Sequence, residues 1–281
     1  MAEGRVVTCA FLHLGGIHDV TKEDTEMTKF IMALAATTAF AAPLSAQTAI
    51  GLVGDNTIVT IDTSTATVSN SVTLEGITLL GIDYRAATGQ IIGVTSEQAI
   101  ITLDPATGKT AELSKMATML PLGDMPVVVD VNPVPDRLRF MTGTTNHRVN
   151  MDTGEVTVDG ELHFDAADTN AATPPMIVAV GYINSFGMPE STAMYDLDAG
   201  LNALIRQTAP NDGTLATIGD LGVTPNGPLS FDVAGSAQGT NTAWLGTGDA
   251  LHTVDLETGA IIESWALNGL DGMIRDLTII P

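Results

Sequence analysis

A short motif recurs along this chain at long, nearly regular intervals. The segment "ITLDPATGKT" at residues 101–110 returns as "HTVDLETGAI" at 252–261 and, more loosely, as "IVTIDTSTATV" at 58–68. Alignment of its aspartate gives intervals of 42, 48, 46 and 57 residues between Asp62, Asp104, Asp152, Asp198 and Asp255. Repeats of this length are typical of propeller blades or solenoid coils. We expect each copy to be an outer hairpin of one blade.

The motif has the composition of a tight turn. In "DPATG", Asp104 can accept a hydrogen bond from the backbone ahead of it, Pro105 presets a turn dihedral, and Gly108 suits a left-handed conformation. The spacing of its oxygen-bearing residues differs from that of an EF-hand loop. Turn formation therefore explains these residues better than calcium ligation does.

A second element, an apolar strand, also repeats and predicts an all-β propeller. Such strands are too apolar for an outer edge and are expected to be innermost. The last one has no outer strands after it, so it should pair with strands near residue 50 and close the ring. Five blades fit the count, or six if residues 212–223 begin a blade of their own. The five strands are "LLGIDY" at 79–84, "VVVDVN" at 127–132, "VAVGYI" at 178–183, "LSFDVA" at 229–234 and "MIRDLTII" at 273–280.

The first part of the chain is expected to direct export. Residues 27–46 read as a signal peptide, with Lys29 before an apolar run and a small-residue ending at Ala46. The apolar run is shorter than the roughly 20 residues that span a bilayer, which predicts no stable membrane insertion. Cleavage near Ala46 would release a single propeller domain, residues 47–281, to the periplasm or the cell exterior. Residues 1–26 are interpreted as an upstream extension from a misassigned start.

The charge balance limits the partners. The chain has 11 lysine and arginine residues against 33 aspartate and glutamate residues, a formal net charge of -22. Such a surface repels nucleic acid and anionic membranes and favours cations or basic partners. The alternative is that the acidity only keeps an exported protein soluble.

Five ordered segments carry a resemblance that extends over the whole of residues 47–281. The chain resembles the bacterial exported family catalogued as domain of unknown function 4394. The resemblance implies a signal peptide and a propeller-like repeat, with no established activity and no catalytic residues to carry over. One departure is Ala86, where the family tends to have proline. The segments are "GIDYRAATGQIIGV", "NPVPDRLRFMT", "HRVNMDTGEVTVDGEL", "PPMIVAVGYINS" and "NDGTLATIGDLGV".

Acidic residues occupy matching places in the predicted inner strands. Gly181 takes the remaining place, and the four carboxylates are expected to meet around the propeller axis. Three explanations remain open: the aspartates cap backbone N–H groups, they hold a hard cation such as calcium, or they catalyse glycan hydrolysis as paired carboxylates. These residues are Asp83, Asp130, Asp232 and Asp276.

Basic residues form a second candidate site. Arg137 and Arg139 are two apart in one expected strand, and Arg148 follows in the next. They are either an anion-binding patch or ion-pair partners of Asp130, Asp136 and Asp152. The histidines show no zinc-binding spacing, and neither a nucleophile elbow nor a phosphate loop is present in the sequence.

Together these features favour a non-enzymatic exported module for binding or scaffolding, which presents an acidic axial face to a hard cation or a basic partner. The alternative is a glycan hydrolase that uses channel carboxylates. Aromatic residues are only 4% of the chain, which disfavours a sugar site built on stacking. The partner is expected to be a protein or a small ligand.

Overall fold

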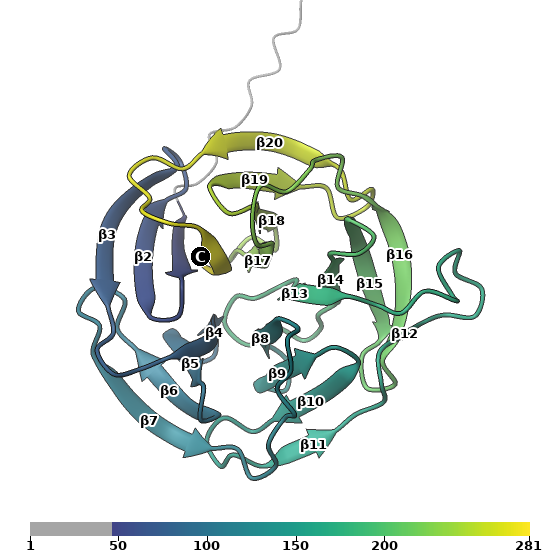
Figure 1. Cartoon of the computed structure of the whole chain (residues 1–281), viewed down its shortest axis with the longest axis horizontal. Helices are drawn as coiled ribbons and strands as arrows, with labels where there is room; N and C mark the ends of the chain where they lie inside the picture. The colour runs from purple at the N-terminus through teal and green to yellow at the C-terminus, as the bar shows by residue number, and fades with distance from the viewer. Residues whose placement is uncertain (1–46) are drawn as a thin grey trace, which may run out of the picture. The chain divides into compact units, whose positions relative to one another are not determined.

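The computed structural model describes residues 47–281, which form five sheets, antiparallel except for one short added strand, arranged as blades around an axis (Figure 1). Blade 1 contains β21 (Ile274–Ile280), β1 (Thr48–Val53), β2 (Thr57–Asp62) and β3 (Thr67–Thr73); blade 2 contains β4 (Leu79–Arg85), β5 (Gln90–Thr95), β6 (Ala99–Leu103) and β7 (Thr110–Lys115). Blade 3 contains β8 (Val127–Asn132), β9 (Arg137–Thr142), β10 (Thr145–Val149) and β11 (Val156–Val158).

The remaining blades complete the ring. Blade 4 contains β13 (Ile177–Tyr182), β14 (Met194–Asp198), β15 (Ala203–Ala209) and β16 (Thr214–Asp220), to which β12 (His163–Phe164) adds in parallel. Blade 5 contains β17 (Ser230–Gly235), β18 (Asn241–Gly246), β19 (Ala250–Val254) and β20 (Ile261–Ala266). The all-β, five-blade prediction is confirmed, and residues 212–223 supply the outer strand of blade 4.

The ring closes through a strand from the C-terminal end of the chain. Strand β21 pairs antiparallel with β1, with Ile280 opposite Thr48 and Leu277 opposite Gly51. This pairing makes blade 1 a composite of both ends of the propeller and covers the edge of β1 that would otherwise be unpaired. All five apolar segments expected to be innermost are innermost: β4, β8, β13, β17 and β21.

The repeated turn has the expected chemistry in the outer hairpins. Oδ1 of Asp104 accepts the N–H of Ala106 at 2.9 Å, and Gly108 is left-handed with φ of 71°. In blade 1 the left-handed position is taken by Ala66, with φ of 48°.

Two of the aligned aspartates are corrected. In blade 3 the motif begins at Asn150, whose Oδ1 accepts the N–H of Asp152 at 3.1 Å. The side-chain oxygen of asparagine can accept the same hydrogen bond as that of aspartate. An alignment that considered only aspartate therefore placed this motif at Asp152, two residues too late. The turn at Asp198 joins β14 to β15, the second and third strands of blade 4, and is therefore not an outer hairpin.

The core consists of apolar seams between neighbouring blades. Phe140 and Leu138 pack toward blade 2, for example, while Phe231 and Leu204 belong to the seam of blades 4 and 5. Within residues 47–281 there is no helix long and apolar enough to cross a membrane. The predicted signal peptide at 27–46 and the extension at 1–26 lie outside the described residues.

Candidate functional site

Three of the four predicted aspartates meet near the axis. Asp83 on β4, Asp130 on β8 and Asp232 on β17 come from three different blades, and each offers one carboxylate oxygen within 4.8 Å of the others. Their exposed fractions are 5%, 3% and 6%. We call these three residues the axial triad.

Two members of the axial triad also tie blades together. Oδ2 of Asp83 accepts the N–H of Val131 on the inner strand of blade 3 at 2.6 Å. Oδ2 of Asp232 accepts the N–H of Ile279 on the inner strand of blade 1, also at 2.6 Å. The backbone-capping role expected as one alternative is therefore present for both residues, although it leaves lone pairs on each carboxylate.

A threonine hydroxyl completes the triad's surroundings. Oγ1 of Thr278 lies 2.7 Å from Oδ1 of Asp83 and 3.1 Å from Oδ2 of Asp232, and it accepts the N–H of Tyr84 at 2.9 Å. A hydroxyl has one proton, so it cannot make a full hydrogen bond to two ionised carboxylates at once. The arrangement therefore calls for a proton on one carboxyl group or for a cation between them.

Asp276 was predicted to join the other aspartates at one level, and here the structure differs. Its Oδ2 accepts the N–H of Ile82 at 2.7 Å, and it does not belong to the axial triad. Thr278 occupies the triad level in β21. Residues two apart point to the same side of a strand but are displaced by about 7 Å along it, which explains the separation.

Blade 4 lacks a carboxylate on its inner strand for a steric reason. A Cβ at Gly181 would lie 2.9 Å from Cγ2 and 3.0 Å from the backbone nitrogen of Val233 on blade 5. Asp196 on the neighbouring strand β14 supplies a carboxylate instead. It is fully buried, and neither of its oxygens has a hydrogen-bond partner among the described residues.

Burial dominates the electrostatics of this region. It raises the pKa of Asp83 and of Asp130 well above the usual range, and neighbouring carboxylates raise both further. Burial raises the pKa of Asp232 to about 6 and that of Asp276 to about 7, despite the backbone N–H groups that favour their ionised forms. Asp130 differs from Asp83, Asp232 and Asp276 because its buried Oδ1 has no hydrogen-bond partner among the described residues.

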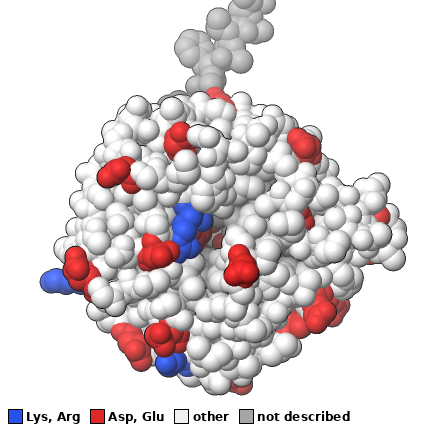
Figure 2. Space-filling view, in the orientation of Figure 1, with Lys and Arg blue, Asp and Glu red and all other residues white. Residues whose placement is uncertain are grey.

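Above the triad an axial cavity of about 820 Å³ opens on one face of the propeller. Residues from all five blades line this cavity, mainly where the inner strands begin, as at Leu79 and Val127. Figure 2 shows a hollow at the centre of this face, with a basic group in it and acidic groups beside it. The charged lining residues are Arg275, Asp55 and Asp124.

Comparison with known proteins identifies the family. A model described as Domain of unknown function (DUF4394) matches residues 46–278. The chain belongs to the DUF4394 family. Among the curated proteins, none matches this DUF4394 chain.

Solved structures similar to this DUF4394 propeller share little sequence with it. A protein of unknown function from Bacteroides caccae has 16% identity and a TM-score of 0.42, covering 80% of this chain and 74% of its own. One from Bacteroides thetaiotaomicron has 14% identity and a TM-score of 0.47, covering 85% and 65%. The PQQ-bound aldose sugar dehydrogenase of Streptomyces coelicolor has 12% identity and a TM-score of 0.43, covering 84% and 90%.

The three arginines of the predicted anion patch are held by groups of the DUF4394 propeller itself. Arg139 is buried and donates to Oδ2 of Asp159 at 2.7 Å, and Arg148 donates to the same oxygen at 2.6 Å. Arg137 donates to the carbonyl oxygens of Pro135 and Asp136. The expected ion pairing occurs for Arg139 and Arg148, but its acceptor is Asp159. An anion-binding role for the three stays a prediction.

The aspartates named as pairing partners have other contacts. Asp136 and Asp152 both accept hydrogen bonds from the buried guanidinium of Arg85 on β4, which joins blade 2 to blade 3. These bonds raise the pKa of Arg85, and they hold that of Asp152 below its usual range. Asp130 belongs to the axial triad. No sequence pattern marks Arg85, Asp159, Asp196 or Thr278, because their roles depend on the register between blades.

Proposed function

We propose that this DUF4394 protein is a non-enzymatic exported binding module whose axial triad holds a hard cation such as calcium. The observation that carries the proposal is the meeting of three buried carboxylates from three blades, one of which has an oxygen with no hydrogen-bond partner. Removing a carboxylate from water costs several kcal/mol, so three ionised groups at this spacing need a compensating positive charge.

The spacing suits such an ion. Calcium binds oxygen ligands at about 2.3–2.6 Å, so two oxygens on one ion lie up to about 5 Å apart. The triad's oxygens lie within 4.8 Å of one another. The free Oδ1 of Asp130 can bind directly, and the lone pairs left on Asp83 and Asp232 can bind without loss of the hydrogen bonds that join the blades. Water would supply the rest of a six- to eightfold shell.

A bound cation would give the acidic residues at the axis a structural role in the propeller. The inner strands of blades 1, 2, 3 and 5 all reach the triad through side chains or hydrogen bonds. Binding of a cation at the axis would then hold the blades together once the protein has been exported to a compartment in which calcium is abundant. The formal charge of -22 also supports a basic protein partner over nucleic acid.

Calcium titration of the purified protein tests this function. We expect a saturable heat of binding in calorimetry and a rise in melting temperature, because a ligand that binds only the folded state stabilises it. Asp130→Asn should abolish both. Asp198→Asn is the matched control, since Asp198 is equally buried but bonds the N–H groups of Met176 and Leu201 away from the triad. Calcium binding that persists unchanged in Asp130→Asn would overturn the proposal.

Glycan hydrolysis stays the alternative, with less support. The triad carboxylates are buried and two of them are already hydrogen bonded to backbone. None of the described residues that line the axial cavity is aromatic, so the cavity offers no stacking surface to a sugar ring.

A further inference from the structure

The axial cavity combines the size and the lining of a small-molecule site. Its volume of about 820 Å³ falls within the range of about 300–1,000 Å³ that ligand pockets occupy. Most of the lining is apolar, which gives a ligand a surface that excludes water. The apolar lining includes Leu79, Leu80, Leu122, Val127, Val178 and Leu229.

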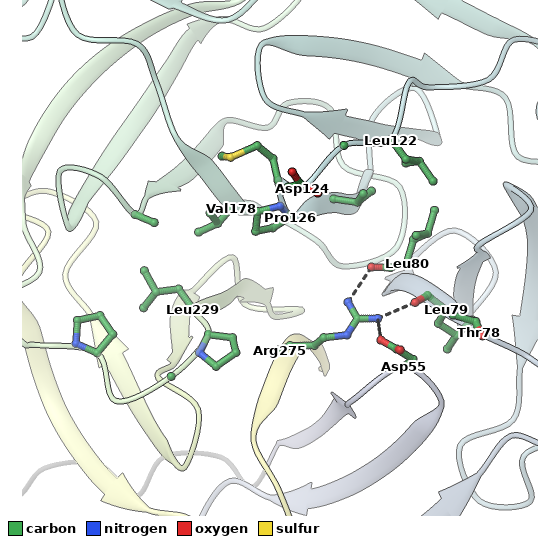
Figure 3. A pocket seen from close by; sticks show the side chains of 17 residues that line it. Asp55, Thr78, Leu79, Leu80, Leu122, Asp124, Pro126, Val178, Leu229 and Arg275 are labelled. Atoms are coloured by element: carbon green, nitrogen blue, oxygen red, sulfur yellow. Dashed lines mark hydrogen bonds and ion pairs between the residues drawn. The ribbon is translucent and has the colours of Figure 1, made fainter.

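Arg275 places a fixed donor at the wall of this cavity. Its guanidinium donates to the carbonyl oxygens of Leu79 at 2.6 Å and of Leu80 at 3.0 Å, and Nε donates to the carbonyl of Gly54. Figure 3 shows the side chain reaching toward Leu79 and Leu80, with Leu229 and Val178 across the cavity. Three of the five N–H groups are used, so Nη1 and Nη2 each retain one for a ligand.

Of the two acidic residues of the lining, Asp55 forms an ion pair with this donor, and that pair is weak because it is long and solvated. The side chain of Asp55 is 76% exposed and its Oδ1 lies 3.8 Å from Nη2, beyond hydrogen-bond distance, whereas the side chain of Arg275 is only 26% exposed. Asp124 is also exposed. Solvated carboxylates at a rim interact weakly with a ligand, while a held, partly desolvated guanidinium binds an oxyanion strongly.

The edge of the cavity can adapt to an apolar body. Met125 lines it, and Met273 packs against the lining residue Gly227 while its side chain remains partly exposed. Methionine is flexible and polarisable and suits surfaces that close over apolar ligands of variable shape. Leu122 is likewise exposed at this cavity.

We infer that the axial cavity binds a small amphipathic carboxylate. The carboxylate group takes the free N–H groups of Arg275, and the apolar body lies along the leucine and valine wall toward Leu229. This site goes beyond the cation site proposed above, because its ligand contacts none of the triad residues.

Calorimetric titration with decanoate, in chelator so that the cation site plays no part, tests this inference. Decanol and decylammonium serve as the neutral and cationic comparators. We expect saturable binding of decanoate. Arg275→Gln should weaken it roughly tenfold, the loss of a charge-assisted hydrogen bond, while changing decanol binding less than twofold. Lys109→Gln, which removes one positive charge at an exposed residue outside the cavity lining, should leave decanoate binding unchanged.

A second variant keeps the test decisive if loss of Arg275 destabilises the protein. Val178→Trp fills the cavity while leaving the guanidinium in place, and it should remove the binding of both decanoate and decanol. The inference is overturned if decanoate shows no saturable binding, if Val178→Trp binds decanoate normally, or if decylammonium binds more tightly than decanoate.

Discussion

The hydroxyl of Thr278 lies 2.7 Å from Oδ1 of Asp83, although 195 positions separate the two residues. Thr278 belongs to the last strand and Asp83 to the inner strand of blade 2, so the contact exists only because the ring is closed. It also places Thr278, and not Asp276, at the level of the axial triad.

Thr278→Val should lower the free energy of unfolding by about 1–3 kcal/mol, because it removes the hydroxyl from two buried carboxylates and leaves the Tyr84 N–H without its acceptor. Urea unfolding measures the change. Thr73→Val on the exposed face of β3 is the control and should stay within about 0.5 kcal/mol. Equal effects of the two substitutions would contradict the role given to the hydroxyl.

Deletion of residues 274–281 should prevent folding. Without β21, β1 loses its inner partner and blade 1 has no strand at the axis. Circular dichroism and amide dispersion in NMR spectra report the loss. Removal of the exposed Pro281 alone should leave both unchanged. A stable, monomeric fold in the longer deletion would show that ring closure is dispensable.

The sequence predicts the blades better than the contacts between them. Apolar runs identified all five inner strands, because a strand buried on both faces reads as a continuous apolar segment. The offset of two inner strands along the propeller axis depends instead on side chains that meet at the interface between neighbouring blades. Alignment of the inner strands therefore places Asp276 at the level that Thr278 occupies, two residues later in β21. Asp196, in "MYDLD", was not identified as a site residue, because only the turn residue Asp198 of that segment matched a repeated motif.

Gly181→Ala should destabilise the propeller by about 1–3 kcal/mol through overpacking, since the added methyl group would press on Val233 of the next blade. The matched control is Gly123→Ala, where no atom lies within 4 Å of the added Cβ. Thermal melting of the two variants distinguishes them. A neutral Gly181→Ala would mean that blade 4 can accept a side chain at this level.

In chelator, the stability of the protein should fall as the pH rises from about 4 to about 7. The pKa of Asp276 is raised to about 7 in the fold, against about 3.9 when unfolded, so in this window the folded state keeps a proton that the unfolded state has lost. The free energy of unfolding then decreases by about 1.4 kcal/mol per pH unit for this group. Its contribution is fully present below pH 4.

Asp276→Asn should reduce that slope by the contribution of one group, as measured by urea unfolding across the same pH range. Asp232, whose pKa is raised to about 6, should still contribute up to about pH 6. Stability that instead rises with pH in chelator, in both proteins, would show that these carboxyl groups are ionised and compensated in the fold without a metal ion.

The most direct measurement of the central claim is anomalous diffraction from crystals in which terbium replaces calcium. We predict one strong peak at the axis, within about 2.3–2.6 Å of carboxylate oxygens of Asp83, Asp130 and Asp232. The same crystals of Asp130→Asn should show no peak there. A wild-type map with terbium only at surface carboxylates, and none between these three residues, would contradict the account.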